Sequence, residues 1–347
     1  MRPRVLAVRL DNAGDVLLTG PALRAIAAGA ESVTLLCGPR GRAAADLLPG
    51  IDSVLEFRAP WIDPEPDAVE RTAIDELVRR LRGAAFDEAV VFTSFHQSPL
   101  PTALVLRLAG IPRVAAVSVD YPGSLLDVRH AVPDDVHEVE RALSLAKAAG
   151  YPLPAGDSGA LAVRPLPPQV RAEPYVVVHP GASVPARAWA PDRHRRLVTA
   201  LAEDGRRVLV TGGPDERVLT EYVAGGDGVD LGGRTSLADL AVVLAGASVV
   251  VTGNTGPAHL GAAVGTPVVS LYAPTVPAVR WRPWGVPHVL LGRQDIACAG
   301  CRARTCPYDH HPCLGEVEVT DVMDAVDLLA PLEPPPATPT AALARRA

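Results

Sequence analysis

The sequence predicts an α/β protein made of two doubly wound domains in tandem, and three observations support this fold class. The chain has 347 residues, a length that suits two domains of about 150 residues each. Short β-rich runs alternate with helical stretches in both halves, which favours parallel sheets covered by helices on both faces. Residues 164–174 hold four prolines in eleven positions, and we interpret them as the interdomain linker.

In the first half, branched apolar residues mark strands and apolar residues at helical spacing mark helices. The expected strands cover residues 4–8, 32–37, 53–57 and 88–92. The expected helices cover residues 15–28, 41–48, 73–81 and 134–150. Gly150 ends the last of these helices, as glycine often does.

The same alternation restarts after the linker. The expected strands of the second half cover residues 175–179, 207–211, 248–252 and 267–271. The expected helices cover residues 192–204, 257–264 and 319–330. Residues 331–347 are rich in proline, alanine and threonine, and they predict a disordered tail.

Composition excludes several classes of protein. Hydrophobic residues make up 48% of the chain, which excludes wholesale disorder, and the net charge of −6 argues against a general nucleic-acid-binding protein. No stretch approaches the ~20 apolar residues of a transmembrane helix. The first strand runs into Arg9 and Asp11 too early for a signal peptide, so we expect a cytoplasmic protein. Lys147 is the only lysine, so any phosphate-binding cation is expected to be an arginine.

Ligands of open α/β sheets bind beyond the carboxyl ends of the strands, so the loops that follow strands are the candidate sites. Residues 9–16 lack the three-glycine pattern of dinucleotide-binding turns, but they place Asp15 at the start of a helix. One interpretation is an N-cap, a position that aspartate favours. The other is a general base that faces the interdomain cleft.

A second loop, Asn254–His259, joins a strand to a helix. Pro257 suits a first helical turn. Backbone N–H groups, the helix dipole and the Thr255 hydroxyl could form an anion site, and Gly256 would allow close approach of a phosphate. The alternative is a well-capped helix that binds no ligand.

Two further loops carry weaker signals. In residues 179–189, Ser183 and Arg187 could embrace a diphosphate, or the loop could be a plain connection with a solvated arginine. Glu216 follows the strand at 207–211 and could bind ribose hydroxyls. It could equally be a first-turn residue that interacts favourably with the helix dipole.

Together these segments resemble glycosyltransferase family 9, the bacterial heptosyltransferases. The run Arg9-Leu10, then Gly14-Asp15-Val16, is similar to the family's N-terminal motif. Residues 179–189, 231–237 and 254–267 follow in the family's order, and residues 274–285 and a cysteine cluster also fit. The resemblance covers residues 4–330.

The resemblance implies the GT-B architecture, in which two Rossmann-like domains face each other across a cleft. Residues 1–163 would form the acceptor-side domain and residues 175–330 the donor domain. It further implies inverting transfer of a sugar from a nucleotide diphosphate, typically ADP-heptose, to a hydroxyl of a glycan or lipopolysaccharide-core-like acceptor. The reaction would need no cofactor and no catalytic metal, and contact with a membrane would be at most peripheral.

The resemblance also implies individual roles. Asp15 falls on the family's catalytic base. Donor-binding positions fall on Ser183, Arg187, Glu216, Asn254, Thr255, Gly256, Pro257 and His259. Asn254 stands where many members have aspartate, which removes a charge beside the donor. Residues 95–98 and 120–124 are expected to face the acceptor, whose identity their chemistry does not reveal.

The cysteine cluster leaves alternatives open. Cys298, Cys301, Cys306 and Cys313 could ligate zinc, form disulfides or stay free. The proposed transfer involves no thiol, so we expect this loop to lie away from the donor-binding motifs.

Three other functions compete with sugar transfer by a heptosyltransferase. An NAD-dependent oxidoreductase would require a glycine-rich turn that neither half shows. A metal-bound interaction module would rest on the cysteines alone. An epimerase, or a transferase that uses another nucleotide sugar on a cell-wall glycan or secondary metabolite, remains closer to the pattern.

Overall fold

The computed structural model describes residues 1–167 and 173–332, and it contains two parallel six-stranded sheets. The first sheet has the order β3-β2-β1-β4-β5-β6. Its strands are β1 (Arg4–Arg9), β2 (Ser32–Cys37), β3 (Ser53–Glu56), β4 (Glu88–Val91), β5 (Arg113–Val117) and β6 (Val128–His130). β1 lies between β2 and β4, where the strand order reverses, and in such sheets this switch point is where ligands bind.

The second sheet repeats this topology with the order β12-β11-β10-β7-β8-β9. Its strands are β7 (Tyr175–His179), β8 (Arg207–Val210), β9 (Val229–Asp230), β10 (Val249–Gly253), β11 (Val268–Leu271) and β12 (His288–Leu291). Here β7 lies at the switch point, between β10 and β8. The predicted fold class, two Rossmann-like α/β domains, is therefore confirmed.

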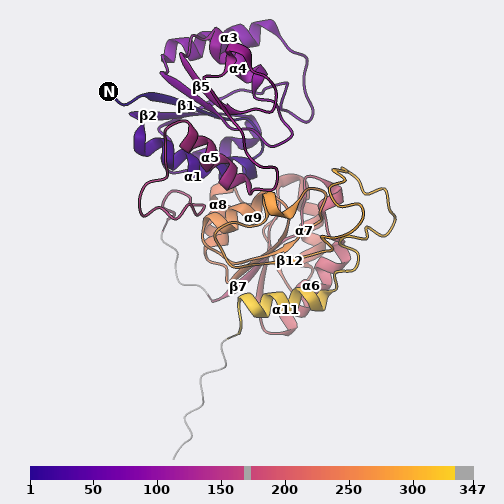
Figure 1. Cartoon of the computed structure of the whole chain (residues 1–347). Coiled ribbons are helices and arrows are strands. Elements are labelled where there is room, and N and C mark those ends of the chain that lie inside the picture. The colour runs from indigo at the N-terminus through magenta and orange to yellow at the C-terminus, as the bar shows by residue number, and fades with distance from the viewer. Residues whose placement is uncertain (168–172, 333–347) are drawn as a thin grey trace, which may run out of the picture.

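Helices cover both faces of each sheet. In the first domain α3 (Arg71–Ala84) and α4 (Leu100–Leu108) lie on one face, and α1 (Ala13–Gly29), α2 (Arg42–Leu47) and α5 (Glu138–Ala148) lie on the other. In the second domain α8 (Leu237–Ala245) and α9 (Gly256–Ala263) face the first domain (Figure 1). The opposite face carries α6 (Pro191–Glu203), α7 (Arg217–Ala224) and α11 (Val319–Leu329), and α10 (Ala278–Trp281) follows β11.

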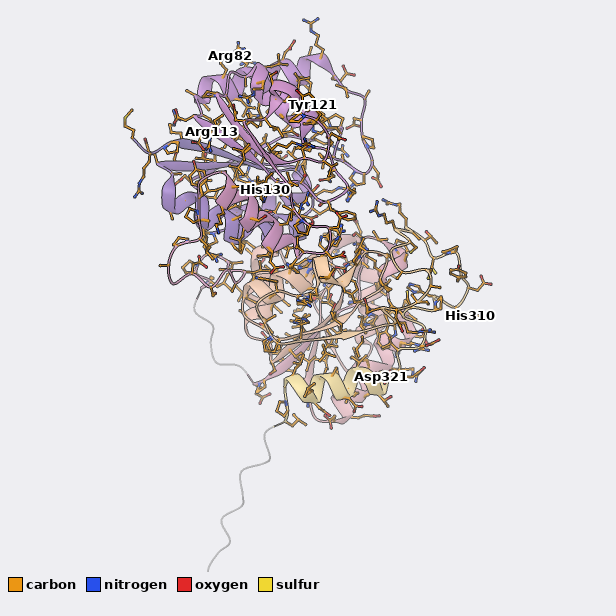
Figure 2. All side chains as sticks on the ribbon, viewed as in Figure 1. Arg82, Arg113, Tyr121, His130, His310 and Asp321 are labelled. Atoms are coloured by element: carbon orange, nitrogen blue, oxygen red, sulfur yellow. The ribbon has the colours of Figure 1, made fainter. Side chains whose placement is uncertain are left out.

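The two domains meet mainly where α1 contacts α9 and α2 contacts α8. One apolar cluster joins Leu17 and Ile26 of α1 to Leu244 of α8 and Leu260 of α9. Because the sheet covers one side of α1 and the second domain covers another, this helix is apolar almost all round, as buried helices are. Figure 2 places Arg82 and Tyr121 on the outer side of the first domain, and His310 and Asp321 on the outer side of the second.

Most predicted elements are present, with ends that shift by a few residues. The helix expected from residue 15 begins at Ala13. Elements that the sequence analysis did not identify are α4, α7, α8, α10, β5, β6, β9 and β12. Several are short, and β9 spans only two residues, so they carry little periodic signal.

The domain boundaries stay predictions. The linker was expected at 164–174, and Arg164 at its start binds back to the first domain through the backbone oxygens of Leu48 and Ile51. Residues 168–172 of that linker, and residues 333–347 of the expected tail, lie outside the described part of the chain. Within residues 1–167 and 173–332, none of the helices combines the length and apolar character that a membrane span requires.

Candidate active site

Asp15 lies in the first turn of α1, directly beyond the carboxyl end of β1. The N-cap of this helix is Asn12, and the Asp15 carboxylate bonds to a side chain: Arg9 Nη2 donates to Asp15 Oδ1 at 3.0 Å. The Asp15 side chain keeps 17% of its surface exposed. The N-cap interpretation is therefore wrong, and the carboxylate faces outward from the helix start.

The start of α9 lies opposite, in the second domain. Thr255 occupies the N-cap position, but its side chain makes no capping bond and its hydroxyl instead pairs with Thr252 Oγ1 at 3.2 Å. Pro257 occupies the first turn, as predicted. A helix start without a side-chain cap leaves backbone N–H groups available to an anion. This geometry favours the anion-site interpretation over a well-capped helix.

A cleft of about 350 Å³ brings the two helix starts together. Its lining includes seven of the predicted site residues, namely Asp15, Ser183, Arg187, Asn254, Thr255, Gly256 and His259. Pro257 follows Gly256 without lining the cleft. Segments separated by more than 160 residues thus form one site, with the carboxylate on one domain and the anion-binding groups on the other.

Arg187 belongs to the 3₁₀ turn η3 (Pro185–Arg187), which follows β7. Its Nε donates to the Thr275 hydroxyl at 3.1 Å, so an uncharged partner holds it in the cleft wall. Burial lowers the pKa of the Arg187 guanidinium, whereas nearby Tyr272 and Asp15 act in the opposite direction. The group remains a cation at neutral pH, and an anionic ligand would stabilise it.

His259 explains why a glycine precedes Asp15. A Cβ atom at Gly14 would lie 2.9 Å from His259 Cδ2 and 3.5 Å from the Cα of Gly256, so only glycine lets α1 and α9 approach this closely. Burial lowers the pKa of His259 to about 4, with the neighbouring Asp15 carboxylate opposing the shift. His259 is therefore neutral at pH 7, and its buried Nδ1 has no partner among the described residues.

Glu216 does not line the cleft. It ends the turn η4 (Pro214–Glu216), where its Oε2 accepts a hydrogen bond from the backbone of Gly213 at 2.7 Å. The carboxylate also packs beneath Gly181, where any Cβ would collide with it. Glu216 thus lies under the 179–189 loop and bonds within its own turn. It does not lie beside the other predicted site residues in the cleft.

The cysteine loop after β12 does not lie away from the donor motifs, as the sequence analysis expected. The backbone N–H of Ala186 donates to Arg304 O at 3.0 Å, and His311 Nε2 lies 2.9 Å from Ala186 O. The N–H of Gly300 donates to Pro274 O at 2.7 Å. The expectation is wrong because β12 pairs in parallel with β11, so the loops beyond both strands emerge at the same edge of the sheet as the 179–189 loop.

The thiols of this loop are free. Over residues 1–167 and 173–332 the structure contains no disulfide, and it assembles no group of three or more histidine, cysteine or acidic side chains suited to a metal ion. Burial raises the pKa of the Cys313 thiol to about 11, with a smaller contribution from Cys306. Of the three alternatives for the cluster, this geometry corresponds to free cysteines.

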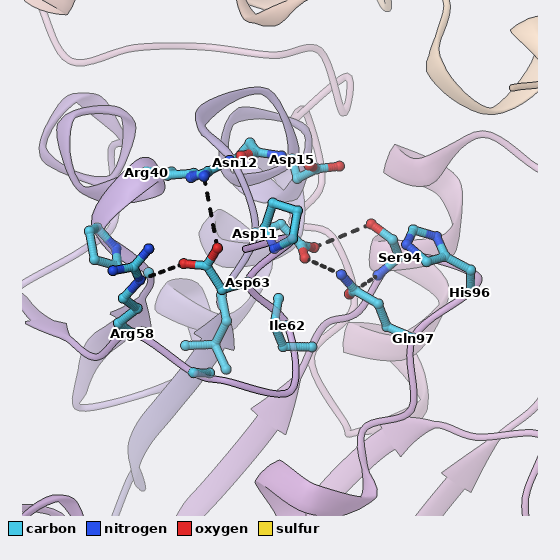
Figure 3. A pocket seen from close by; sticks show the side chains of 15 residues that line it. Asp11, Asn12, Asp15, Arg40, Arg58, Ile62, Asp63, Ser94, His96 and Gln97 are labelled. Carbon is cyan, nitrogen blue, oxygen red and sulfur yellow. Dashed lines mark hydrogen bonds and ion pairs between the residues drawn. The ribbon is translucent and has the colours of Figure 1, made fainter. Parts of the chain in front are cut away.

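Behind Asp15 lies a charged cluster that the sequence analysis missed. It contains Arg9 at the end of β1, Asp11 in the loop that follows, Ser94 and Gln97 after β4, and Glu138 at the start of α5. Figure 3 shows Ser94 and Gln97 reaching Asp11. The charge of Arg9 at the end of an apolar strand could have indicated this cluster. The sequence does not reveal its partners, however, because Glu138 lies 129 positions further along the chain.

A second cavity, of about 150 Å³, continues from the cleft on the first domain's side. Arg40 and Arg58 both reach Asp63 in its wall (Figure 3). His96 and Gln97 of the 95–98 loop line it, whereas residues 120–124 line neither cavity. That either loop faces the acceptor stays a prediction.

Comparison with known proteins decides the family. The family model described as glycosyltransferase family 9 (heptosyltransferase) matches residues 74–311, which is more than half of the chain. The chain belongs to glycosyltransferase family 9. This membership decides against the oxidoreductase and against a purely structural metal-bound module.

One relative of this family 9 member is lipopolysaccharide heptosyltransferase 1 of Pseudomonas aeruginosa, which is 32% identical over 333 residues and covers 88% of each chain. A family 9 structure from Veillonella parvula has a TM-score of 0.77 at 16% identity, covering 94% of this chain and 97% of that one. An E. coli heptosyltransferase solved with ADP-2-deoxy-2-fluoro heptose has a TM-score of 0.72 at 22% identity, covering 94% and 99%. The structural likenesses show the GT-B fold, and the family makes the chain a glycosyltransferase.

Proposed function

We propose that this glycosyltransferase moves heptose from ADP-heptose to a hydroxyl of a lipopolysaccharide-core-like acceptor. The observation that carries the proposal is one cleft that joins a carboxylate of the first domain to an arginine and an uncapped helix start of the second. The names of the relatives support the substrates, because one is a lipopolysaccharide enzyme and one was solved with an ADP-heptose analogue.

In the proposed reaction the acceptor oxygen attacks the anomeric carbon of the sugar from the side opposite the leaving group. The new C–O bond forms as the bond to the β-phosphate oxygen breaks, so the configuration inverts. Asp15 takes the hydroxyl proton as a general base, and ADP leaves with the bonding electron pair. Oδ1 of Asp15 accepts from Arg9, and we assign Oδ2 to the acceptor hydroxyl.

On the donor side, Arg187 and the N-terminus of α9 would stabilise the charge that develops on the departing ADP. Ser183 and Thr255 offer hydroxyls to the phosphates, and Gly256 and Pro257 hold the backbone that faces them. Asn254 is neutral and buried, so it adds no repulsion beside a diphosphate. These groups supply the neutralising role without a catalytic metal, which activity assays with and without chelator would check.

A ribose contact by Glu216 remains a weaker prediction. Its carboxylate would first have to turn away from the Gly213 backbone. Substitution of Glu216 by glutamine with unchanged ADP affinity would contradict a ribose contact.

We also propose that the enzyme acts in the cytoplasm, with at most a peripheral contact to the membrane that carries its acceptor. The support is its kinship with lipopolysaccharide enzymes, whose acceptor is a glycolipid. Cell fractionation tests this proposal, and recovery in a membrane pellet that resists washing at high salt would contradict it.

The donor is tested by thermal shift with ADP-heptose, ADP-glucose, UDP-glucose and GDP-mannose, followed by mass spectrometry of the product. We expect the ADP sugars to raise Tm most and ADP-heptose to give product with a core acceptor. Preference for a UDP or GDP sugar would instead favour the alternative function, glycosylation of a cell-wall glycan or secondary metabolite.

Asp15→Asn tests the base. The amide keeps the size of the side chain but accepts no proton, so turnover should fall by about 10²-fold or more while donor affinity stays nearly constant. Full turnover in the purified, folded variant would exclude Asp15 as the base.

A further inference from the structure

Arg9 closes β1, and its guanidinium faces three carboxylates at once. Its Nε lies 2.8 Å from Asp11 Oδ2, its Nη2 lies 3.0 Å from Asp15 Oδ1, and its Nη1 lies 3.5 Å from Glu138 Oε2. Arg9 is only 2% exposed. Because burying a charge is costly, such a residue persists only where its partners compensate for the lost water.

The three carboxylates differ in how they are satisfied. Asp11 accepts hydrogen bonds from Ser94 Oγ at 3.2 Å and from Gln97 Nε2 at 2.5 Å. Burial raises the pKa of Asp11, and Arg9 and these two hydrogen bonds oppose the shift. Glu138 is 2% exposed, and neither of its oxygens accepts a hydrogen bond within the described part of the chain. Burial raises the pKa of Glu138, with Arg9 opposing the shift. Among the described residues, Glu138 thus lacks the hydrogen bonds that the other two carboxylates receive, and Arg9 is its charged partner at 3.5 Å.

We propose that Arg9 is the positioning residue of the catalytic site: it orients the Asp15 carboxylate toward the acceptor hydroxyl. This inference rests on the proposed role of Asp15 as the base. Nη2 divides its contacts between Asp15 Oδ1 and Ser94 Oγ, which lies 2.8 Å away. Ser94 in turn donates to Asp11. The planar fork of the guanidinium therefore ties Asp15 to a rigid strand end and leaves its second oxygen for the substrate.

Lysine could supply the same charge but not the same geometry. A guanidinium reaches several acceptors along fixed directions in one plane, whereas an ammonium is a point charge on a flexible stem. A carboxylate displaced by a fraction of an ångström from its reactive geometry loses much of its catalytic effect. Arg9→Lys is therefore the informative change, because it separates orientation from charge.

Other ionisable groups also face Asp15, and all remain in place in this experiment. Asp11 comes from the same loop, Glu138 from α5 and His96 from the loop after β4, whereas Arg187 and His259 face it from the second domain. Burial lowers the pKa of His96 and of His259, so both are neutral at pH 7. Arg9 is thus the cation in direct contact with the base.

The experiment is a double-mutant cycle of Arg9→Lys with Asp15→Asn in the full-length enzyme. We expect Arg9→Lys to lower kcat by ~10- to 10²-fold, with unchanged affinity for ADP. In the Asp15→Asn background the same change should alter kcat by less than about twofold, because there is no base left to orient. A merely structural role would lower kcat by the same factor in both backgrounds, and that result would overturn the inference.

Two further variants keep the test decisive. Ser94→Ala removes the second anchor of Nη2 without changing any charge, so it replaces Arg9→Lys in the cycle if that variant does not fold. Arg206→Lys is the matched control: Arg206 is also buried, contacts Asp204 and Asp327, and precedes β8 at the edge of the sheet opposite the cleft. It should lower Tm without a change in kcat.

The two proposals fail in distinguishable ways. If Asp15→Asn keeps full turnover, the base is wrongly assigned. If Asp15→Asn abolishes turnover while Arg9→Lys and Ser94→Ala keep full turnover, only the positioning role is wrong.

Discussion

At the residue scale, two side chains at the helix starts of the cleft make no capping hydrogen bond to their own helices. Asp15 occurs where an aspartate commonly caps a helix, yet Asn12 holds the cap position and Asp15 turns to Arg9. Thr255 holds the N-cap position of α9, but its hydroxyl pairs with Thr252 and does not cap the helix. Hydrogen-bonding groups that the helices leave unpaired are the ones available to a ligand.

Arg187→Ala should weaken the binding of ADP itself. Arg187 is held by a neutral hydroxyl, and its charge faces the cleft that Asp15 enters from the other domain. A charge-assisted hydrogen bond is worth ~1.5–3 kcal/mol, or roughly one to two orders of magnitude in Kd. Calorimetry with ADP measures the change.

The matched control is Arg195→Ala, because Arg195 stacks on Tyr222 at an exposed surface and binds its backbone oxygen. The control should leave Kd unchanged. An unaltered Kd in Arg187→Ala as well would remove Arg187 from the diphosphate site.

At the scale of elements, the site exists because two helix starts from different domains approach within contact distance. Gly14 near the start of α1 permits this approach, because a Cβ there would lie 2.9 Å from His259 Cδ2. The cysteine loop contributes too: Arg302 lies over the Phe95 ring at 4.6 Å, and Arg304 O accepts from the backbone N–H of Ala186. The cysteine loop thus connects the 179–189 loop to the first domain.

Gly14→Ala should impair turnover more than it impairs ADP binding. The added methyl would lie 2.9 Å from the buried ring of His259, so α1 and α9 must separate and Asp15 moves away from the donor. Gly83→Ala in α3 is the control, since its Cβ would meet nothing within 4 Å and alanine favours a helix. Equal kcat values for both variants would show that the approach of the helices is not needed.

Thiol counting tests the cysteine loop. Burial raises the pKa of Cys37 and of Cys313 to about 11, so both should react slowly with an alkylating reagent in the native protein. Cys301 is exposed and should react first. In denaturant without reductant, all five cysteines should titrate.

Elemental analysis of the same sample gives the opposing outcome. One equivalent of bound zinc or iron, or fewer than five thiols, would mean that the loop adopts a metal-bound or oxidised arrangement.

At the scale of the whole molecule, the two domains pack against each other through an apolar cluster and through contacts of buried histidines. His137 at the start of α5 accepts from the backbone N–H of Val139 through Nδ1, and its Nε2 lies 2.9 Å from Arg282 O in the second domain. Its ring stacks on Trp284 with centroids 4.5 Å apart. Because Nδ1 acts as an acceptor, this contact between the domains requires the neutral ring.

Stability should therefore fall as pH decreases from about 6.5 toward 4. Burial lowers the pKa of His137 and His259 to about 4 and that of His194 to about 3. Between those values and the ordinary value of 6.5 the unfolded chain binds more protons than the folded one, so each histidine contributes a slope of up to about 1.4 kcal/mol per pH unit. Denaturant unfolding at several pH values measures this slope.

His137→Asn should reduce the slope of unfolding free energy against pH by up to about 1.4 kcal/mol per pH unit, because asparagine caps a helix well but does not titrate. His310→Asn is the control, since His310 is exposed on the cysteine loop (Figure 2). The interpretation is wrong if both variants keep the slope of the unmodified protein.

The sequence by itself determined the two-domain α/β class, most strands and helices, the family resemblance and seven of the residues that line the cleft. Periodicity and loop chemistry are local properties, and Asp15, Arg187 and Thr255 each follow a strand within a few residues. Only the tertiary structure decided that Arg9 faces Asp11, Asp15 and Glu138. It also decided that the cysteine loop contacts the 179–189 loop and that Glu216 lies outside the cleft. These are contacts between distant segments, and they depend on which strands are neighbours and how two domains pack, which no local pattern encodes.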